Sequence, residues 1–352
     1  MKPSIVRLAI IGCGAVVRRH HLPVLINNKS IDITSICDKD LNAADEIKNK
    51  FDLKCKLTDD PLKVFSMPDV DVVDICTPGA THFDLALQAI RNGKHVLLEK
   101  PPVMHLAEAN LLIREARERK LKIGTIFNNR YRYIIEELRK KIDVGLFGRI
   151  VKINILHHAN FVYAESPWLW DEKTSKYLVY EFGIHMFDLL TYIFGEHLNV
   201  EQVISFQRPE LGMTTEIQVS VTFKSGSFAH VTISQDSLRH STYKTTIDVF
   251  GTAMDGHVRL FPALLRFSSG AEHPLDLIFS EIKSFLRLAY YIGTRKWGFF
   301  QNRGHYMLLN EFINCILGKN EYCLSLSDVL PTIRLLEDIS DRIPGYSKRN
   351  NT

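Results

Sequence analysis

The segment IIGCGAVVRRHHLPVL, residues 10–25, decides the fold of the first part of the chain. It continues the apolar run VRLAIIG (6–12) and passes into a helical pattern. Gly12 and Gly14 occupy the first two positions of a G-x-G-x-x-G/A turn, where the first glycine permits a tight turn and the second lets backbone N–H groups approach a pyrophosphate. Val17 departs from the small residue usual at the third position. The predicted dinucleotide contacts of this turn are Gly12, Gly14, Ala15, Val16 and Val17.

An acidic residue supports this interpretation. Asp38 ends the second apolar run, 21 residues beyond Val17, where a carboxylate accepts the ribose hydroxyls of a dinucleotide. The alternative is a glycine turn with a helix-capping aspartate, but the two features together favour the dinucleotide site. Asp38 would repel a 2′-phosphate and so favours NAD over NADP, although the neighbouring Lys39 weakens that preference.

Strand-like and helical segments alternate around this turn. The strand-like runs are rich in Ile, Val and Leu, which is typical of strands covered on both faces. They lie at 6–12, 31–38, 70–77, 94–100 and 121–127, and helical patterns follow at 81–93 and 105–120. This alternation predicts an α/β domain with a Rossmann-type, doubly wound parallel sheet.

The pattern changes after about residue 126. EIQVSVTF (216–223) alternates apolar and polar residues, turns at KSGS and returns through FAHVTIS (228–234), which predicts a β-hairpin. Further strands are expected at 149–157, 199–207 and 244–251, and helices at 183–194, 305–317 and 327–342. The expected organisation is a dinucleotide-binding domain at 1–125 and an α+β domain at 126–352, with a large, mostly antiparallel open sheet.

Composition excludes several classes of protein. The 352 residues are 45% hydrophobic and 24% charged, and 44 basic and 40 acidic residues leave a net charge of +4. This charge is too small and diffuse for a nucleic-acid-binding surface, and no apolar run reaches the ~20 residues of a membrane span. Six cysteines without a CxxC pair and an N-terminus that leads directly into a strand predict a reduced, cytoplasmic protein.

Two further motifs follow predicted strands, at the edge where open α/β sheets bind ligands. CTPGATH supplies Thr77, Pro78 and His82, and LLEKPP supplies Glu99 and Lys100. A lysine between a buried strand and a proline turn is held in place, although an isolated lysine here would usually be a routine loop residue.

The apolar segment YEFGIHMFDLL (180–190) carries Glu181, His185 and Asp188. On a continuous α-helix, positions i, i+4 and i+7 fall within about 40° of one another. The three groups would form one stripe, which faces either solvent or a cleft where an imidazole between carboxylates performs acid–base chemistry.

Together these motifs resemble the Gfo/Idh/MocA oxidoreductase family, the superfamily of glucose–fructose oxidoreductase and inositol dehydrogenase. The resemblance runs through IIGCGAVV, DICTPGATH, LLEKPP, FNNRYRY (127–133), GLFGRI (145–150) and EFGIHMFD (181–188). The Glu-Lys-Pro triplet joined to a downstream Gly-x-His-x-x-Asp is its most specific part.

The resemblance implies roles for particular residues. Lys100 and His185 would lie beside the nicotinamide and the reacting carbinol, and Asp188 would be the substrate-side aspartate. Glu181 stands where the family usually has aspartate, and would hold the imidazole of His185. Arg130 would contact substrate or cofactor, or else form a structural ion pair.

Other candidates stay open. Trp168 and Trp170 would cover a sugar face or anchor a core, and no metal is expected, since one helix rarely supplies a complete site. The resemblance also implies a homodimer or homotetramer.

The resulting hypothesis is an NAD(H)-dependent oxidoreductase acting on a secondary alcohol or ketone of a sugar, nucleotide sugar or cyclitol, without nucleic-acid or membrane partners. The alternatives are an NAD-dependent glycosidase that oxidises its substrate transiently and a non-catalytic dinucleotide-binding relative.

Overall fold

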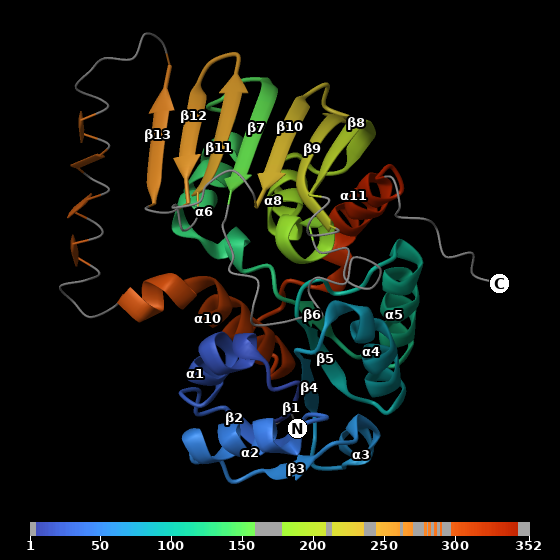
Figure 1. Cartoon of the computed structure of the whole chain (residues 1–352). Helices are drawn as coiled ribbons and strands as arrows, with labels where there is room; N and C mark the ends of the chain where they lie inside the picture. The colour runs from blue at the N-terminus through green and yellow to red at the C-terminus, as the bar shows by residue number, and fades with distance from the viewer. Residues whose placement is uncertain are drawn as a thin grey trace. The chain divides into compact units, whose positions relative to one another are not determined.

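The computed structural model describes residues 5–158, 178–208, 213–235, 244–260, 263–269 and 297–343, together with four pairs at 278–279, 281–282, 285–286 and 289–290. The chain forms two compact units (Figure 1). The first comprises Met1–Asn128 and Asn302–Ile333, and the second comprises Asn129–Gln301 and Arg334–Thr352. Residues 302–333, which the sequence places in the second domain, thus belong to the first unit.

The first unit is built on a six-stranded sheet in the order β3-β2-β1-β4-β5-β6, in which every pairing is parallel. The strands are β1 (Val6–Ile11), β2 (Ile31–Cys37), β3 (Lys56–Thr58), β4 (Val72–Ile75), β5 (His95–Leu98) and β6 (Ile123–Thr125). The order reverses between β1 and β4, and ligands of doubly wound sheets bind at this switch point, beyond the carboxyl ends of the strands. The predicted parallel sheet is confirmed.

Capping residues set where several helices of this unit begin. The Asp40 carboxylate accepts the Asn42 N–H, and that of Asp60 accepts the Leu62 N–H, which satisfies backbone donors at the helix starts. The helices are α1 (Leu22–Leu25), α2 (Leu41–Lys50), α3 (Pro61–Ser66), α4 (His82–Arg91) and α5 (Leu106–Glu118). Helix α10 (Trp297–Ile316) adds its residues from Asn302 onward, where Gly304 packs so closely on the Asn128 backbone that a Cβ would clash.

The second unit contains a seven-stranded sheet in the order β13-β12-β11-β7-β10-β9-β8. Only the β7–β10 pairing is parallel among these strands, which confirms the expected mostly antiparallel sheet. The strands are β7 (Ile150–His158), β8 (His197–Arg208), β9 (Met213–Phe223), β10 (Phe228–Ser234), β11 (Lys244–Gly251), β12 (Asp255–Arg259) and β13 (Leu264–Ser268). Its helices are α6 (Tyr133–Asp143), α8 (Ile184–Phe194) and the larger part of α11 (Leu330–Ser340).

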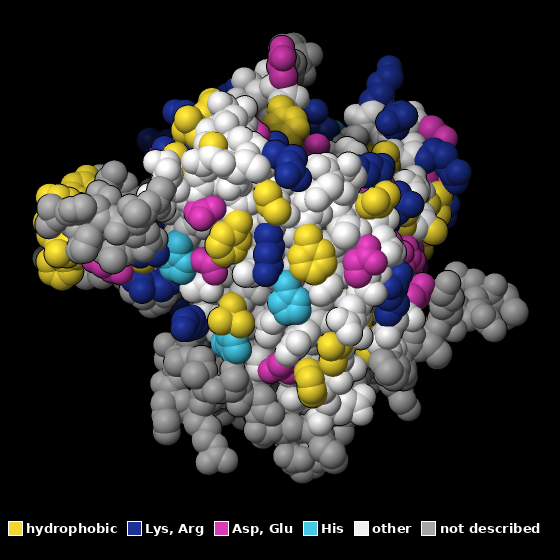
Figure 2. All heavy atoms as spheres, turned by 90° about the horizontal axis from the view of Figure 1, so that it is seen from above, with side chains coloured by type: hydrophobic (Ala, Val, Ile, Leu, Met, Phe, Trp, Pro, Cys, Tyr) yellow, Lys and Arg dark blue, Asp and Glu magenta, His cyan; other side chains and the backbone are white. Residues whose placement is uncertain are grey.

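The two faces of this sheet differ in composition. Alternate residues such as Ile153, Val219 and Val231 are buried, whereas their neighbours in sequence are at least partly exposed. Figure 2 looks onto the molecule from above, and there Lys, Arg, Asp, Glu, His and apolar side chains are interspersed without a patch of one charge.

Candidate active site

The glycine turn follows β1 directly, and its two glycines have different structural roles. Gly12 has a φ of +98°, and a Cβ there would lie 2.8 Å from the backbone carbonyl of Cys76, so any side chain is excluded. At Gly14 a Cβ would meet nothing within 4 Å. This open space, just before helical residues begin at Ala15, is a cradle that a side chain would fill, and it fits a pyrophosphate approaching the backbone. Val17 is fully buried.

Asp38 lies beside the glycine turn, as the sequence predicts. Its Oδ2 accepts the Cys13 N–H at 2.6 Å and its Oδ1 accepts the Asp40 N–H at 2.9 Å. The neighbouring Arg18 is bound elsewhere, because its Nε donates to the Cys13 carbonyl and its Nη1 pairs with Glu46. Strand β2 thus presents a fixed carboxylate next to the turn.

His82 ties together the loops that follow β4 and β5. The ring is fully buried, with Nδ1 at 2.7 Å from the Pro101 carbonyl and Nε2 at 2.8 Å from the Thr77 carbonyl. These two loops carry the CTPGATH and LLEKPP motifs. Through these contacts His82 holds the two loops together. Its contact with the dinucleotide stays a prediction.

A buried ionic cluster surrounds His21 and includes Glu99, the residue before Lys100. His21 is fully buried, with Nδ1 at 2.8 Å from Asp74 Oδ2 and Nε2 at 2.9 Å from Glu99 Oε1. Burial would raise the pKa of Glu99, but the hydrogen bond and charge of His21 lower it to about 2. Burial likewise opposes protonation of His21, yet the charge of Asp74 raises its pKa well above the ordinary value.

Helix α10 closes this cluster. His305 Nε2 lies 3.9 Å from Glu99 Oε1, and the His305 ring stacks on His20 with centroids 4.6 Å apart. His20 Nδ1 lies 2.6 Å from Asn302 Oδ1.

Sequence reasoning missed this cluster, although one feature pointed to it. Asp74 is a charged residue inside the fully buried four-residue strand β4, and a carboxylate in such a place requires a partner. Among the described residues, both groups able to hold a metal ion contain His21: one with Asp74 and Cys76, the other with Glu99 and His305. Hydrogen bonds to carboxylates already account for both nitrogens of its ring.

In the second unit, the predicted stripe is interrupted at its start. A π-helical turn covers Leu178–Gly183, and α8 begins only at Ile184. Glu181 and His185 are therefore not four residues apart on one continuous α-helix, and the expected alignment of the stripe does not apply. Gly183 is required here, since a Cβ would lie 2.7 Å from the backbone carbonyl oxygen of Leu178. Such π-turns within helices occur frequently at functional sites.

Asp188 binds Arg130 within the same unit. Nε and Nη2 of Arg130 lie 2.9 and 2.6 Å from the two carboxylate oxygens, and both side chains are buried. The guanidinium also lies over the Tyr192 ring, 4.8 Å from its centroid. Arg130 therefore forms the structural ion pair that was one of its two expected roles. Contact of Arg130 or Asp188 with substrate stays a prediction. Trp168 and Trp170 lie outside the described residues.

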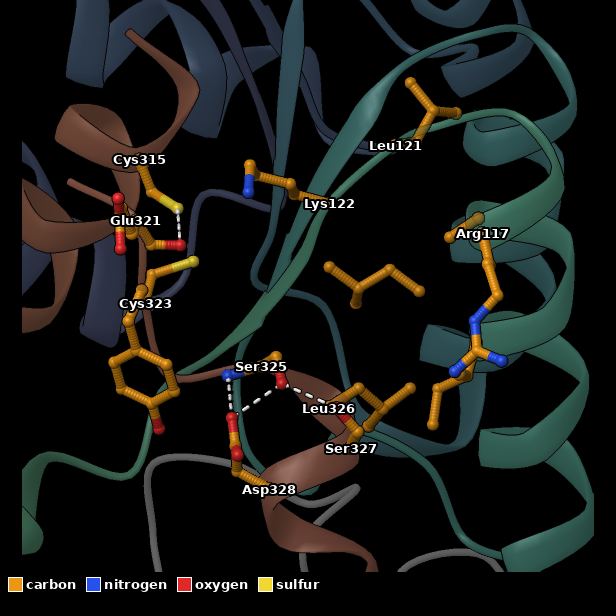
Figure 3. Close-up of a pocket in the computed structure, with 14 residues that line it drawn as sticks. Arg117, Leu121, Lys122, Cys315, Glu321, Cys323, Ser325, Leu326, Ser327 and Asp328 are labelled. Atoms are coloured by element: carbon orange, nitrogen blue, oxygen red, sulfur yellow. Dashed lines mark hydrogen bonds between the residues drawn. The ribbon is translucent and has the colours of Figure 1, made fainter. Parts of the chain in front are cut away.

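A pocket of about 480 Å³ opens in the first unit between α5 and segment 315–328 (Figure 3). None of the predicted site residues lines it. Asp328 accepts the N–H and hydroxyl of Ser325, and the Cys315 thiol donates to the Glu321 carbonyl. Burial, together with Cys315, raises the pKa of the Cys323 thiol. These groups are engaged internally and suggest no chemistry.

Comparison with known proteins places these features in a family. Residues 6–127 match the model of an oxidoreductase family with an NAD-binding Rossmann fold, and residues 135–254 match the GFO/IDH/MocA C-terminal domain. The chain belongs to the Gfo/Idh/MocA oxidoreductase family. The resemblance inferred from the sequence is thereby confirmed, and the first unit of this Gfo/Idh/MocA protein is an NAD-binding domain.

Relatives of this Gfo/Idh/MocA protein include two curated enzymes. It is 28% identical over 200 residues to D-glucoside 3-dehydrogenase of Escherichia coli, a match covering 55% of this chain and 56% of that enzyme. It is also 28% identical over 258 residues to myo-inositol 2-dehydrogenase of Thermotoga maritima, covering 70% and 73%. The first match thus spans little more than half of the relative's length.

The fold is shared with the WlbA dehydrogenase from Bordetella pertussis, solved in complex with NADH and UDP-GlcNAcA. The TM-score is 0.79 at 18% identity, covering 97% of this chain and 98% of the other. In the described part of the chain, no helix combines the length and apolar character needed to cross a membrane.

Proposed function

We propose that this protein is an NAD(H)-dependent dehydrogenase or reductase that acts on a secondary alcohol or ketone of a sugar, nucleotide sugar or cyclitol. One observation carries the proposal: the glycine turn, Asp38 and Lys100 follow β1, β2 and β5, at the carboxyl edge of a single parallel sheet. This edge is where a dinucleotide binds in such folds. The relatives that act on glucosides and inositol support a carbohydrate or cyclitol substrate.

We assign three side chains to the chemistry. NAD, when bound, supplies the hydride acceptor or donor. Lys100 polarises the substrate oxygen, and His185 takes the hydroxyl proton during oxidation and returns it during reduction. Glu181, which is buried in the turn before α8, holds the imidazole. Thr77, Pro78 and His82 form the loop beside the cofactor, and Arg130, Asp188 and Trp168 contribute to substrate binding.

NAD is the preferred cofactor in this proposal. A 2′-phosphate would meet the Asp38 carboxylate, and Arg18, which binds the neighbouring Cys13 carbonyl, already pairs with Glu46. Lys39 is exposed and adds positive charge, which reduces the expected preference for NAD over NADP.

The test is a screen of myo-inositol, simple glucosides and uridine diphosphate sugars with NAD, followed by NADH absorbance. Turnover of one class that Lys100→Ala and His185→Ala both abolish supports the proposal, with Lys63→Ala on the exposed face of α3 as a control. Tight NADH binding without turnover of any probe would favour a non-catalytic relative. Tightly retained cofactor with glycoside cleavage and no net reduction would favour a glycosidase.

A further inference from the structure

The contacts of His21 determine where a buried proton lies. Ionised carboxylates only accept hydrogen bonds, and a neutral imidazole carries a single N–H. Two ring nitrogens at 2.8 and 2.9 Å from carboxylate oxygens therefore require either an imidazolium or a protonated carboxyl group. The charge of Asp74 raises the pKa of His21 well above its ordinary value, and His21 in turn lowers the pKa of Glu99 to about 2. The two hydrogen bonds and these shifts together favour the imidazolium.

The other groups around His21 do not alter this assignment. Cys76 Sγ lies 3.5 Å from His21 Nδ1 and 3.4 Å from Asp74 Oδ1, and burial raises the pKa of this thiol, so it stays neutral. The His305 ring, from α10, lies 5.8 Å from that of His21, and its Nε2 lies 3.9 Å from Glu99 Oε1, where its charge also favours ionised Glu99. His21 is thus the cation between two buried carboxyl groups.

The remaining oxygen of Glu99 connects this cluster to Lys100. Glu99 Oε2 accepts the backbone N–H of Lys100 at 2.9 Å. The charge of Lys100 also favours the ionised form of Glu99. One carboxylate therefore joins the buried imidazolium to the backbone that carries the lysine.

We propose that His21 is a positioning residue for Lys100. As a buried cation it keeps Glu99 ionised, and ionised Glu99 fixes the Lys100 backbone at the end of β5. Asp74 balances the second side of the ring. The proposal rests on the proposed function only in taking Lys100 to act on the substrate oxygen; the charge state of His21 is independent of it.

The charge state is tested without any substrate. In protein labelled with ¹⁵N-histidine, long-range ¹H–¹⁵N spectra distinguish imidazolium from neutral rings, and His21→Gln identifies the signal by its disappearance. We expect His21 to remain an imidazolium at pH 8, where an ordinary histidine is neutral. A neutral His21 ring at pH 7 would overturn the proposal. If His21→Gln does not fold, His21→Asn identifies the signal in the same way.

The positioning role is tested by kinetics with the best probe from the screen. We expect His21→Gln to lower kcat about 10- to 100-fold, the scale for losing a partner that orients an active group, with little change in NADH affinity. As the pH is lowered, the activity of His21→Gln should also begin to fall at a higher pH than that of the native protein. The reason is that Glu99 without its cation takes up a proton more readily. His21→Gln/Asp74→Asn removes the excess negative charge and should recover part of kcat.

The matched control is His20→Gln, one residue away on the same helix and without a carboxylate partner among the described contacts. An unchanged pH profile in His21→Gln, or a double variant slower than the single one, would reduce His21 to a packing role. Loss of activity in Lys100→Ala with full activity in His21→Gln would refute this proposal alone. Full activity in Lys100→Ala would instead refute the proposed function.

Discussion

Asp38 accepts two backbone N–H groups and still lies at the rim of the glycine turn. We predict that NADH binds more tightly than NADPH, and that Asp38→Ala narrows the difference by removing repulsion from the 2′-phosphate. Fluorescence titration of both cofactors measures it. Lys39→Ala is the matched control and should weaken the binding of NADPH without changing that of NADH. Tighter NADPH binding by the native protein would show that Lys39 or Arg18 dominates.

His185 carries the proton step of the proposed reaction. We predict that His185→Ala lowers kcat by about 10²- to 10⁴-fold, the usual effect of losing a positioned acid–base group, while NADH affinity changes little because the glycine turn and Asp38 lie elsewhere in the chain. Glu181→Asp should retain activity if the carboxylate only orients the ring. His230→Ala, on the partly exposed face of β10, is the control. Near-native turnover of His185→Ala would remove this residue from the mechanism.

His157 makes the second unit sensitive to acid. Burial lowers the pKa of this imidazole to about 3, from an ordinary value of 6.5, and its Nδ1 lies 2.7 Å from Thr245 Oγ1. Below about pH 6.5 this imidazole is protonated in the unfolded chain. In the folded chain it stays neutral down to about pH 3. We predict that this residue removes about 1.4 kcal/mol of unfolding free energy for each pH unit within that window.

Urea unfolding between pH 7 and pH 4 tests this prediction. His157→Gln should flatten the loss of stability as the pH falls, whereas His257→Gln, half-buried on β12 beside Asp248, should not. Equal slopes for native protein and His157→Gln would contradict it.

At the scale of elements, the strand–turn–helix unit separates stability from binding. Gly12→Ala places a methyl group against the Cys76 backbone at positive φ, and should cost at least about 1–2 kcal/mol of unfolding free energy. Gly14→Ala meets open space, so its Tm should stay close to native while NADH affinity falls. Thermal unfolding and cofactor titration measure the two effects. A Gly14→Ala protein with native affinity would show that the dinucleotide does not approach this backbone.

The elements themselves were largely predictable. Repeated Ile- and Val-rich runs marked β1, β2, β4, β5 and β6, because a strand covered on both faces admits few polar residues. The β9–β10 hairpin was equally predictable, since strict alternation of apolar and polar residues indicates a half-buried strand. The glycine turn and Asp38 were predictable because their chemistry is local in sequence.

Features that depend on distant contacts were not predictable. His21, Asp74 and Glu99 come from three separate elements, and only the parallel register brings their side chains together. The π-turn at Leu178–Gly183 leaves an ordinary helical pattern in the sequence. The recruitment of residues 302–333 to the first unit depends on tertiary packing, such as that of Gly304 on Asn128, which no periodicity reports.

At the scale of the molecule, the face of the seven-stranded sheet that carries its exposed side chains bears on assembly. Ile204 and Phe206 on β8 and Phe250 on β11 are exposed there, beside polar residues such as Gln218 and Ser220. We predict a dimer or a dimer of dimers formed through this face. Light scattering at micromolar concentration measures the mass. Phe206→Glu/Phe250→Glu should dissociate the assembly, and Leu62→Glu on exposed α3 should not. A native protein that is monomeric would contradict the prediction.

The divided first unit has a consequence for synthesis of the protein. Strand β6 is the last strand of its sheet, and Thr125 donates its N–H to the carbonyl of Leu324, about 200 residues later in the chain. A nascent chain emerging from the ribosome therefore holds an incomplete nucleotide-binding unit until translation is nearly finished, although domains generally fold as units in order of synthesis. Nascent chains stalled before residue 302 should remain sensitive to protease in residues 1–128, and chains extended past residue 333 should acquire resistance there.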